Sequence, residues 1–192
     1  MLDKVLDFSF LYPGSWEVRE IEERGYSEVF IIGPRNKDDT YSLSLSVSVI
    51  PRREAGGEFD TLDELVKHYL SEDKGSPGFK EISGVEGTFA SLEAVEFVIS
   101  YAMPLPLNAV EPKATTILER RIATARGPYF YELAYGAVEE DYYAFLDAFR
   151  HVARTFEFHE EGAAEKLEFR PLVTLTPTLA IRERPTEYET DT

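Results

Sequence analysis

The 192-residue chain contains no cysteine, which excludes disulfide bridges, thiolate metal ligands and cysteine nucleophiles. Positive charge is also scarce, because 20 Lys and Arg residues stand against 36 Asp and Glu, giving a formal net charge of -16. Nucleic-acid affinity comes mostly from cations that neutralise phosphates, so this balance argues against nucleic-acid partners and against adsorption to anionic membranes. A cationic protein surface or metal cations would be attracted instead.

Long hydrophobic runs are missing too. No run approaches the ~20 apolar residues that span a bilayer, so no direct membrane insertion is expected. Residues 1–10 include Asp3, Lys4 and Asp7 and show no signal-peptide pattern. The chain nevertheless has 43% hydrophobic and 13% aromatic residues, enough for a sizeable core, and its length fits one domain. We therefore expect a soluble monomer.

The composition changes after Gly162, where prolines interrupt an apolar strip that leads into a polar end. This change divides the chain into a folded domain over residues 1–160 and an acidic, proline-containing tail over residues 161–192. We expect the tail to be dispensable for folding, since chain ends without a patterned apolar face are seldom ordered.

Strict alternation is clearest over residues 41–50, where apolar side chains occupy one face and four serines occupy the other. This pattern predicts a strand of an antiparallel sheet that buries one face. Shorter alternating runs predict further strands over residues 8–12, 28–32, 95–101, 115–125 and 129–135. Residues 78–87 are predicted to form a loop or a short edge strand.

Two helices are expected, near residues 61–74 and 140–154. Thr61 and Glu64 have the spacing of a capping box at the start of the first helix. The second helix has acidic residues at its start, where the helix dipole favours them, and an apolar stripe formed by Tyr142, Phe145, Leu146, Phe149 and Val152. The order of these elements predicts an α+β fold with a central antiparallel sheet flanked by helices.

Several of these segments resemble the PsbP family. Residues 8–16 read FSFLYPGSW, which is similar to the aromatic-rich strand, proline and tryptophan that start PsbP domains. Residues 43–51 and 61–65 resemble the serine/valine strand and capped helix of that family, and residues 145–158 its final helix. The resemblance covers about residues 5–158. It implies a PsbP-like αβα sandwich, a fold shared with a Ran-binding nuclear-import factor and with bacterial lipoproteins.

PsbP proteins are extrinsic subunits of photosystem II that support its manganese–calcium cluster. The resemblance therefore implies a non-enzymatic accessory protein that docks on a larger protein complex, with photosystem II as the family's own example. The alternatives are an extracytoplasmic lipoprotein-like or stress-associated binding domain without a photosynthetic role, and a small-molecule enzyme. A PsbP-like protein would work in the thylakoid lumen or another extracytoplasmic space after loss of a signal, whereas a native start at Met1 would imply the cytoplasm.

Nucleophilic catalysis by Ser or Thr would need a nearby histidine, and the histidines of the chain are His68, His151 and His159. The sequence has no G-x-S-x-G, P-loop, G-x-G-x-x-G or HExxH pattern, so no catalytic residue is predicted. His159, Glu160 and Glu161 form the one local cluster of imidazole and carboxylates. They could hold a calcium or other divalent ion weakly, or form a solvated charged surface. No other cofactor is expected.

The segment from residue 103 to 112 contains three prolines, so we expect a loop that cannot continue a central strand. Its apolar residues are Met103, Leu105, Leu107 and Val110. Exposed on a proline-stiffened loop, they would form a docking surface for a protein partner or a membrane-protein complex. The alternative is that the loop folds back over the sheet.

Overall fold

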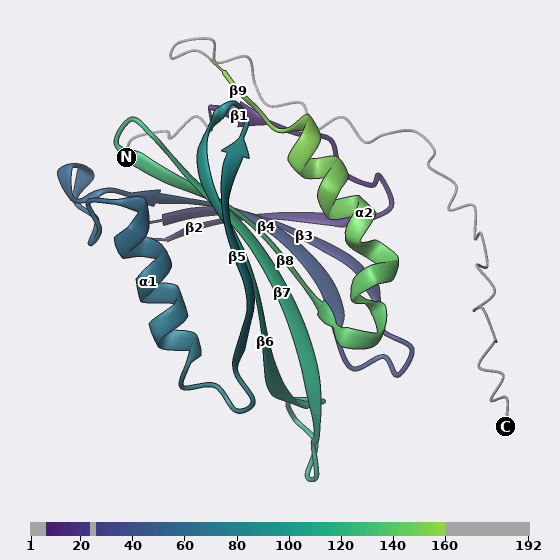
Figure 1. The fold of residues 1–192 in the computed structure, drawn as a ribbon. Helices are drawn as coiled ribbons and strands as arrows, with labels where there is room; N and C mark the ends of the chain where they lie inside the picture. Colours follow the sequence, from purple (N-terminus) through teal and green to yellow (C-terminus); the bar gives the residue numbers. More distant parts are fainter. Residues whose placement is uncertain (1–6, 24–25, 160–192) are drawn as a thin grey trace, which may run out of the picture.

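The computed structural model describes residues 7–23 and 26–159. In this part of the chain, the elements in order are β1 (Phe8–Ser9), β2 (Glu17–Glu23), β3 (Tyr26–Arg35), β4 (Ser42–Pro51), the 3-10 turn η1 (Arg53–Ala55), α1 (Leu62–Asp73), β5 (Lys80–Phe89), β6 (Leu92–Leu105), β7 (Lys113–Arg126), β8 (Tyr129–Val138), α2 (Glu139–Thr155) and β9 (Glu157–Phe158). Figure 1 shows the two helices on either side of the sheet. The predicted α+β fold with an antiparallel sheet flanked by helices is therefore confirmed.

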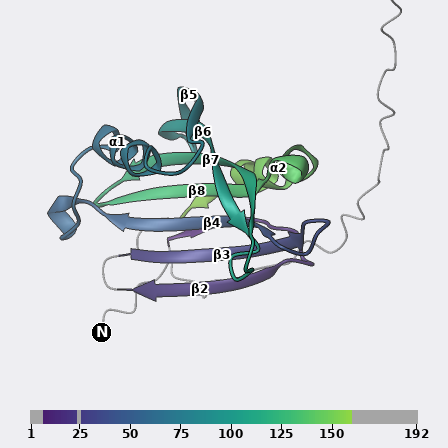
Figure 2. The ribbon, with the colours of Figure 1, turned by 90° about the horizontal axis from the view of Figure 1, so that it is seen from below.

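The main sheet of the described chain is seven-stranded and antiparallel, in the order β2-β3-β4-β8-β7-β6-β5. Strands that follow one another in the chain pair within two groups, β2-β3-β4 and β5-β6-β7-β8, and the pairing of β8 with β4 joins the two groups (Figure 2). None of the helices in the described residues is long and apolar enough to cross a membrane.

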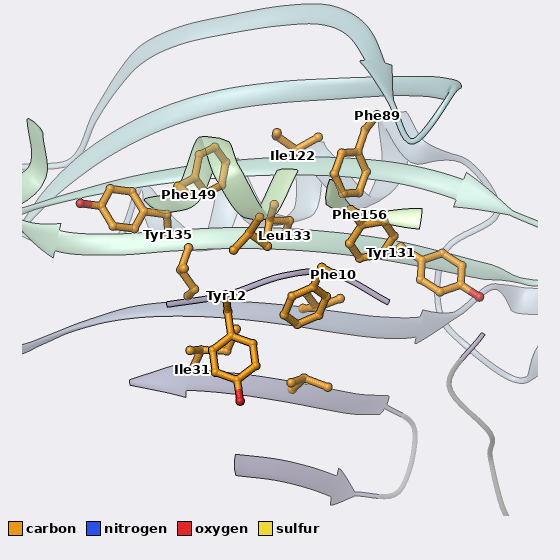
Figure 3. Close-up of a cluster of buried hydrophobic side chains, with 14 of the residues drawn as sticks. Phe10, Tyr12, Ile31, Phe89, Ile122, Tyr131, Leu133, Tyr135, Phe149 and Phe156 are labelled. Atoms are coloured by element: carbon orange, nitrogen blue, oxygen red, sulfur yellow. The ribbon is translucent and has the colours of Figure 1, made fainter. Parts of the chain in front are cut away.

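One face of the sheet packs on α2 and forms the main core (Figure 3). The alternation of β4 works as predicted, because Leu45, Val47 and their apolar neighbours are buried while the serines lie on the other face. Strand β8 continues this face, and the ring of its Tyr135 lies 5.8 Å from Phe149 of α2. The predicted stripe of α2 is thereby confirmed, since Tyr142, Leu146, Phe149 and Val152 are buried.

The opposite face is covered by α1 over β6 and β7. Leu65 of α1 is only 1% exposed. The predicted cap also forms, because the Glu64 N–H donates to Thr61 Oγ1 at 3.2 Å and Glu64 Oε2 accepts the Asp60 N–H at 2.9 Å. The second bond lowers the pKa of Glu64. These two hydrogen bonds satisfy one backbone N–H in the first turn of α1 and one just before the helix, and they thereby stabilise the helix N-terminus.

The two ends of the described domain meet. Strands β1 and β9 pair antiparallel, with Phe8 opposite Phe158. Arg126 of β7 binds both ends, since its Nη1 lies 2.5 Å from Asp7 Oδ2 and its Nη2 donates to the His159 carbonyl at 2.6 Å. The Tyr131 hydroxyl adds a bond of 2.8 Å to Asp7 Oδ1. A β7 side chain thus holds the beginning and the end of the fold at one corner of the sheet.

One strand of the sheet is absent from the sequence-based expectations. Strand β2 was not predicted, because its sequence EVREIEE is charged and lies at a sheet edge. Of the two alternatives for residues 78–87, a loop or a short edge strand, the edge strand is confirmed, because most of these residues belong to the ten-residue strand β5 at the other edge of the sheet. Trp16 is half-buried at the rim of the core beside Phe145, with ring centroids 6.4 Å apart.

Candidate functional site

The hairpin of β6 and β7 projects beyond the rest of the sheet (Figure 1). Strand β5 pairs with β6 only as far as Ser100, and β8 pairs with β7 only from Ile117 onward. Residues 101–105 and 113–116 therefore find their strand partners in each other. We call residues 101–116 the arm, and residues 106–112 its tip.

The tip presents apolar side chains to solvent. Leu107 is 74% exposed and Val110 is fully exposed. The turn is closed by the Ala109 N–H, which donates to the Pro106 carbonyl at 3.1 Å, and Pro106 and Pro112 restrict its backbone. The tip is thus an apolar surface with few conformations to lose on binding.

The arm is anchored by a small second core at its base. Leu105 is 4% exposed and packs with Ile117 and Val138, while Tyr101 and Met103 pack against this group. The expectation that all four apolar residues of the segment lie on an exposed loop is therefore wrong for Leu105, and Met103 is half-buried. The cause is that β6 continues through residues 103–105, where it has a strand neighbour on one side only, and such edge positions accept proline.

A buried cluster of charged and phenolic side chains lies next to this small core, between the sheet and α1. Its charged members are Glu119 and Arg121 of β7 and Glu132 of β8, whose side chains are 14%, 16% and 6% exposed. The Arg121 Nε donates to Glu119 Oε1, and its Nη1 lies 3.8 Å from Glu132 Oε1. Tyr101 donates to Glu119 Oε2 at 3.0 Å, while the Tyr69 ring of α1 lies 4.5 Å from the guanidinium. This polar cluster joins the arm, the sheet and α1.

The polar cluster holds an unusual carboxyl. Burial raises the pKa of Glu132 to about 7; Arg121 opposes this rise and Glu119 adds to it. Its Oε2 is buried and has no hydrogen-bond partner in the described chain. Burial alone would lower the pKa of Arg121, but the carboxylates of Glu132 and Glu119 raise it, so the guanidinium stays charged. Glu132 is therefore the group of the cluster that exchanges its proton near neutral pH.

The raised pKa of Glu132 predicts a pH-dependent stability. Because the folded state holds this proton up to a pH of about 7 and an ordinary carboxyl releases it near 4.5, the free energy of unfolding should fall as the pH rises through this window and then level off. Glu132→Gln should remove that part of the slope. Urea unfolding at pH 5, 6, 7 and 8 measures it, with the exposed Glu20→Gln as the control that keeps the slope. Parallel curves for the protein and Glu132→Gln would contradict this assignment.

The predicted metal site is only partly within the described residues. His159 uses its backbone N–H to donate to the Asp7 carbonyl at 2.7 Å, whereas Glu160 and Glu161 lie outside the described residues. In the part of the chain that the structure describes, no group of three His, Asp or Glu side chains is placed to hold a metal. Weak divalent binding at His159, Glu160 and Glu161 stays a prediction, as does the dispensability of the tail, which also lies outside.

The other two histidines lie on α1 and α2, apart from His159. The His68 ring lies 4.8 Å from Phe59 and 6.1 Å from Tyr69. His151 Nε2 is buried without a hydrogen-bond partner among the described residues. Arg120 and Arg121 both form ion pairs across strands: Arg120 Nη1 lies 2.9 Å from Glu96 Oε1 of β6, and Arg121 Nη1 lies 3.8 Å from Glu132 Oε1 of β8.

The comparisons with known proteins identify a fold and no more. No family model and no curated protein matches the chain. LpqN of Mycobacterium tuberculosis, described as involved in cell envelope biogenesis, matches with a TM-score of 0.51 at 16% identity, over 80% of this chain and 83% of that one. PA94 of Pseudomonas aeruginosa matches with a TM-score of 0.51 at 12% identity, over 70% of this chain and 91% of the PA94 chain. It is described as a protein of unknown function and a putative regulator. The solution structure of the cyanobacterial PsbP, CyanoP, from Synechocystis sp. PCC 6803 gives a TM-score of 0.49 at 15% identity, over 80% of this chain and 87% of that one. The chain is therefore similar in fold to LpqN and PA94.

Proposed function

We propose that this protein is a non-enzymatic accessory protein that docks on a larger protein complex through the tip of the arm. The observation that carries the proposal is the exposure of Leu107 and Val110 on a turn whose base is fixed by a small core and by the polar cluster. Exposed apolar side chains on a preorganised support are the usual form of an interface anchor.

The size of the expected effect follows from the area that two such side chains bury. A fully buried Leu or Val contributes about 1.5–3 kcal/mol, so the tip supplies roughly a hundred- to ten-thousand-fold in affinity before ordering losses. The net charge of -16 adds a second contribution, because it steers the protein toward a basic partner surface. Association should therefore be faster at low salt than at high salt.

The test is capture of a partner by the protein and by Leu107→Ser/Val110→Ser. A pull-down from native membranes, read by mass spectrometry, should lose its specific partner with the double variant. The melting temperature of the double variant should differ from that of the unaltered protein by less than about 2 °C, because substitutions at exposed positions change stability little. Tyr143→Ser is the matched control, since Tyr143 is a 75% exposed residue of α2 and not of the tip; this variant should capture the partner normally.

Leu105→Ser separates the tip from its base. Leu105 is buried, so this substitution should reduce the free energy of unfolding by about 2–5 kcal/mol and should affect capture only through stability. Equal capture by the protein and by the double tip variant would move the contact surface elsewhere. Turnover of a substrate that stops when a histidine is replaced would overturn the non-enzymatic proposal itself.

The same pull-down distinguishes two candidate partner complexes. A photosystem II complex is supported by the PsbP resemblance of residues 8–16 and of the segments that follow. A cell-envelope complex is supported by the shared fold with LpqN, which is described as acting in envelope biogenesis. Capture from thylakoid membranes alone favours the first complex, and capture from envelope membranes alone favours the second.

A further inference from the structure

Strand β5 is an open edge of the sheet. It pairs with β6, and no other strand of the described chain pairs with it. Nine of its ten residues are exposed, because neither helix lies over them. The register to β6 shifts between Glu81 and Ser83 but is regular from Ser83 to Phe89.

The turn after β5 determines which backbone groups point outward. Ala90 and Ser91 have φ values of 48° and 68°, as in the two-residue hairpin turn that makes Phe89 and Leu92 a hydrogen-bonded pair. Hydrogen bonding alternates along an antiparallel ladder. Gly84, Glu86 and Thr88 therefore direct their N–H and C=O groups away from β6. These groups form a template for another strand.

Side chains leave this template accessible and partly apolar. Ile82 is 56% exposed and Val85 is 62% exposed. A Cβ added at Gly87 would meet no atom within 4 Å, and one added at Gly84 would meet only Glu81 Oε1, at 3.6 Å. The segment from Ser83 to Phe89 contains neither lysine nor proline, the residues that commonly protect natural sheet edges.

The charge around the template selects the kind of strand that fits. Glu81 and Glu86 are exposed on β5, and Glu93 is exposed on β6 opposite Thr88. The cation of β5, Lys80, lies at its far end, before the bulge. A second copy of this chain would bring another net charge of -16 to the same place and would be repelled, whereas a cationic strand would be attracted.

We propose that the outer edge of β5 binds an extended, lysine- or arginine-rich segment of a partner protein as an added β-strand. Backbone hydrogen bonds to Gly84, Glu86 and Thr88 would hold the segment, Ile82 and Val85 would contact its apolar side chains, and the glutamates would contact its cations. This inference goes beyond the proposed function and does not depend on the tip of the arm, which is a separate surface.

The test uses a capped heptapeptide of alternating Lys and Val, titrated into the full-length protein and followed by two-dimensional amide NMR. Binding should shift the amide signals of Gly84, Glu86 and Thr88 and slow their exchange with solvent. A heptapeptide of alternating Glu and Val should leave these signals unchanged. The variant Leu107→Ser/Val110→Ser should bind the Lys–Val peptide as the unaltered protein does, so that failure here and failure of the tip are distinguishable.

Two variants of β5 complete the test. Thr88→Pro removes one outward N–H without removing a bond to β6, and Val85→Lys places a like charge beside the incoming strand with no demand on the backbone. Each should weaken binding at least tenfold, and Val85→Lys serves if Thr88→Pro does not fold. Unaltered affinity of the variants, equal binding of the Glu–Val peptide, or shifts confined to other strands would each overturn the proposal.

Protection of the β5 amides without peptide would also overturn it. Protection that increases with protein concentration would show that the occupant is a second copy. Protection that is independent of concentration would show that another part of this chain occupies the edge.

Discussion

Replacing Arg121 with methionine should lower the free energy of unfolding by about 3–5 kcal/mol at pH 7, the usual effect of removing one partner from a buried ion pair. The guanidinium lies between Glu119 and Glu132, and both carboxyl side chains are largely buried. Without it, two acidic groups face each other away from water, and the pKa of Glu132 should rise further. Urea unfolding measures the loss, which should shrink at pH 5, where Glu132 is protonated in both proteins.

The matched control is Arg150→Met. Arg150 makes an ion pair of 3.0 Å with Asp147, but the two side chains are 55% and 89% exposed, so water screens the pair. Arg150→Met should therefore lower the free energy of unfolding by less than about 1 kcal/mol. If Arg121→Met were as mild as Arg150→Met, the polar cluster would not be holding α1 and β8 together. Replacing Glu119, Arg121 and Glu132 all by apolar residues should recover much of the loss.

Phe156→Ala should reduce the free energy of unfolding by about 3–5 kcal/mol, as large-to-small substitutions of buried aromatic residues do. Phe156 is 3% exposed, and its ring centroid lies 5.1 Å from Phe8, 4.7 Å from Phe89 and 5.1 Å from Phe158. One ring therefore joins β1, the end of β5 and β9. Denaturant unfolding measures the change, and faster hydrogen exchange in β1 would show that the corner opens first.

Tyr143→Ala is the control for this substitution, because Tyr143 is an aromatic residue of α2 that is 75% exposed. It should change stability by less than about 0.5 kcal/mol. A loss below about 1 kcal/mol for Phe156→Ala would mean that the neighbouring rings collapse into the space and that the corner does not depend on this residue.

The elements that were predictable from sequence are those with one buried face. Strand β4 alternates serine with apolar residues, and α2 repeats its apolar positions at helical spacing, so each pattern identifies its own element. Strand β5 is exposed on both faces, and β2 is a charged edge, so neither carries that alternation. The order of the sheet also escaped prediction, because the pairing of β4 with β8 joins residues far apart in the chain.

The polar cluster has one signal in the sequence, a charged residue within an aromatic strand. Glu132 interrupts an aromatic strand, YFYELAY, in which Phe130, Tyr131, Leu133 and Tyr135 are buried. A charge in such a strand needs a partner. The partner could not be named beforehand, because Arg121 reaches Glu132 only through the register that places Arg121 opposite Ala134 and Glu132 opposite Ala123. The same limit applies to residues 103–112. Their composition shows which residues are apolar, but only the pairing of β6 with β7 determines that Leu105 is buried and Leu107 is exposed.

The pairing of β1 with β9 has a consequence for how the domain can be presented to other molecules. The first and last strands of the described domain lie together at the corner where Phe89 and Phe156 meet, and the arm tip lies at the opposite end of the sheet (Figure 1). Strand β6 starts beside that corner and runs for 14 residues, a reach of roughly 40 Å. The β6–β7 hairpin therefore holds Leu107 and Val110 at a fixed distance from the corner at which the described chain enters and leaves the domain, and lengthening or shortening the hairpin by residue pairs would change that distance.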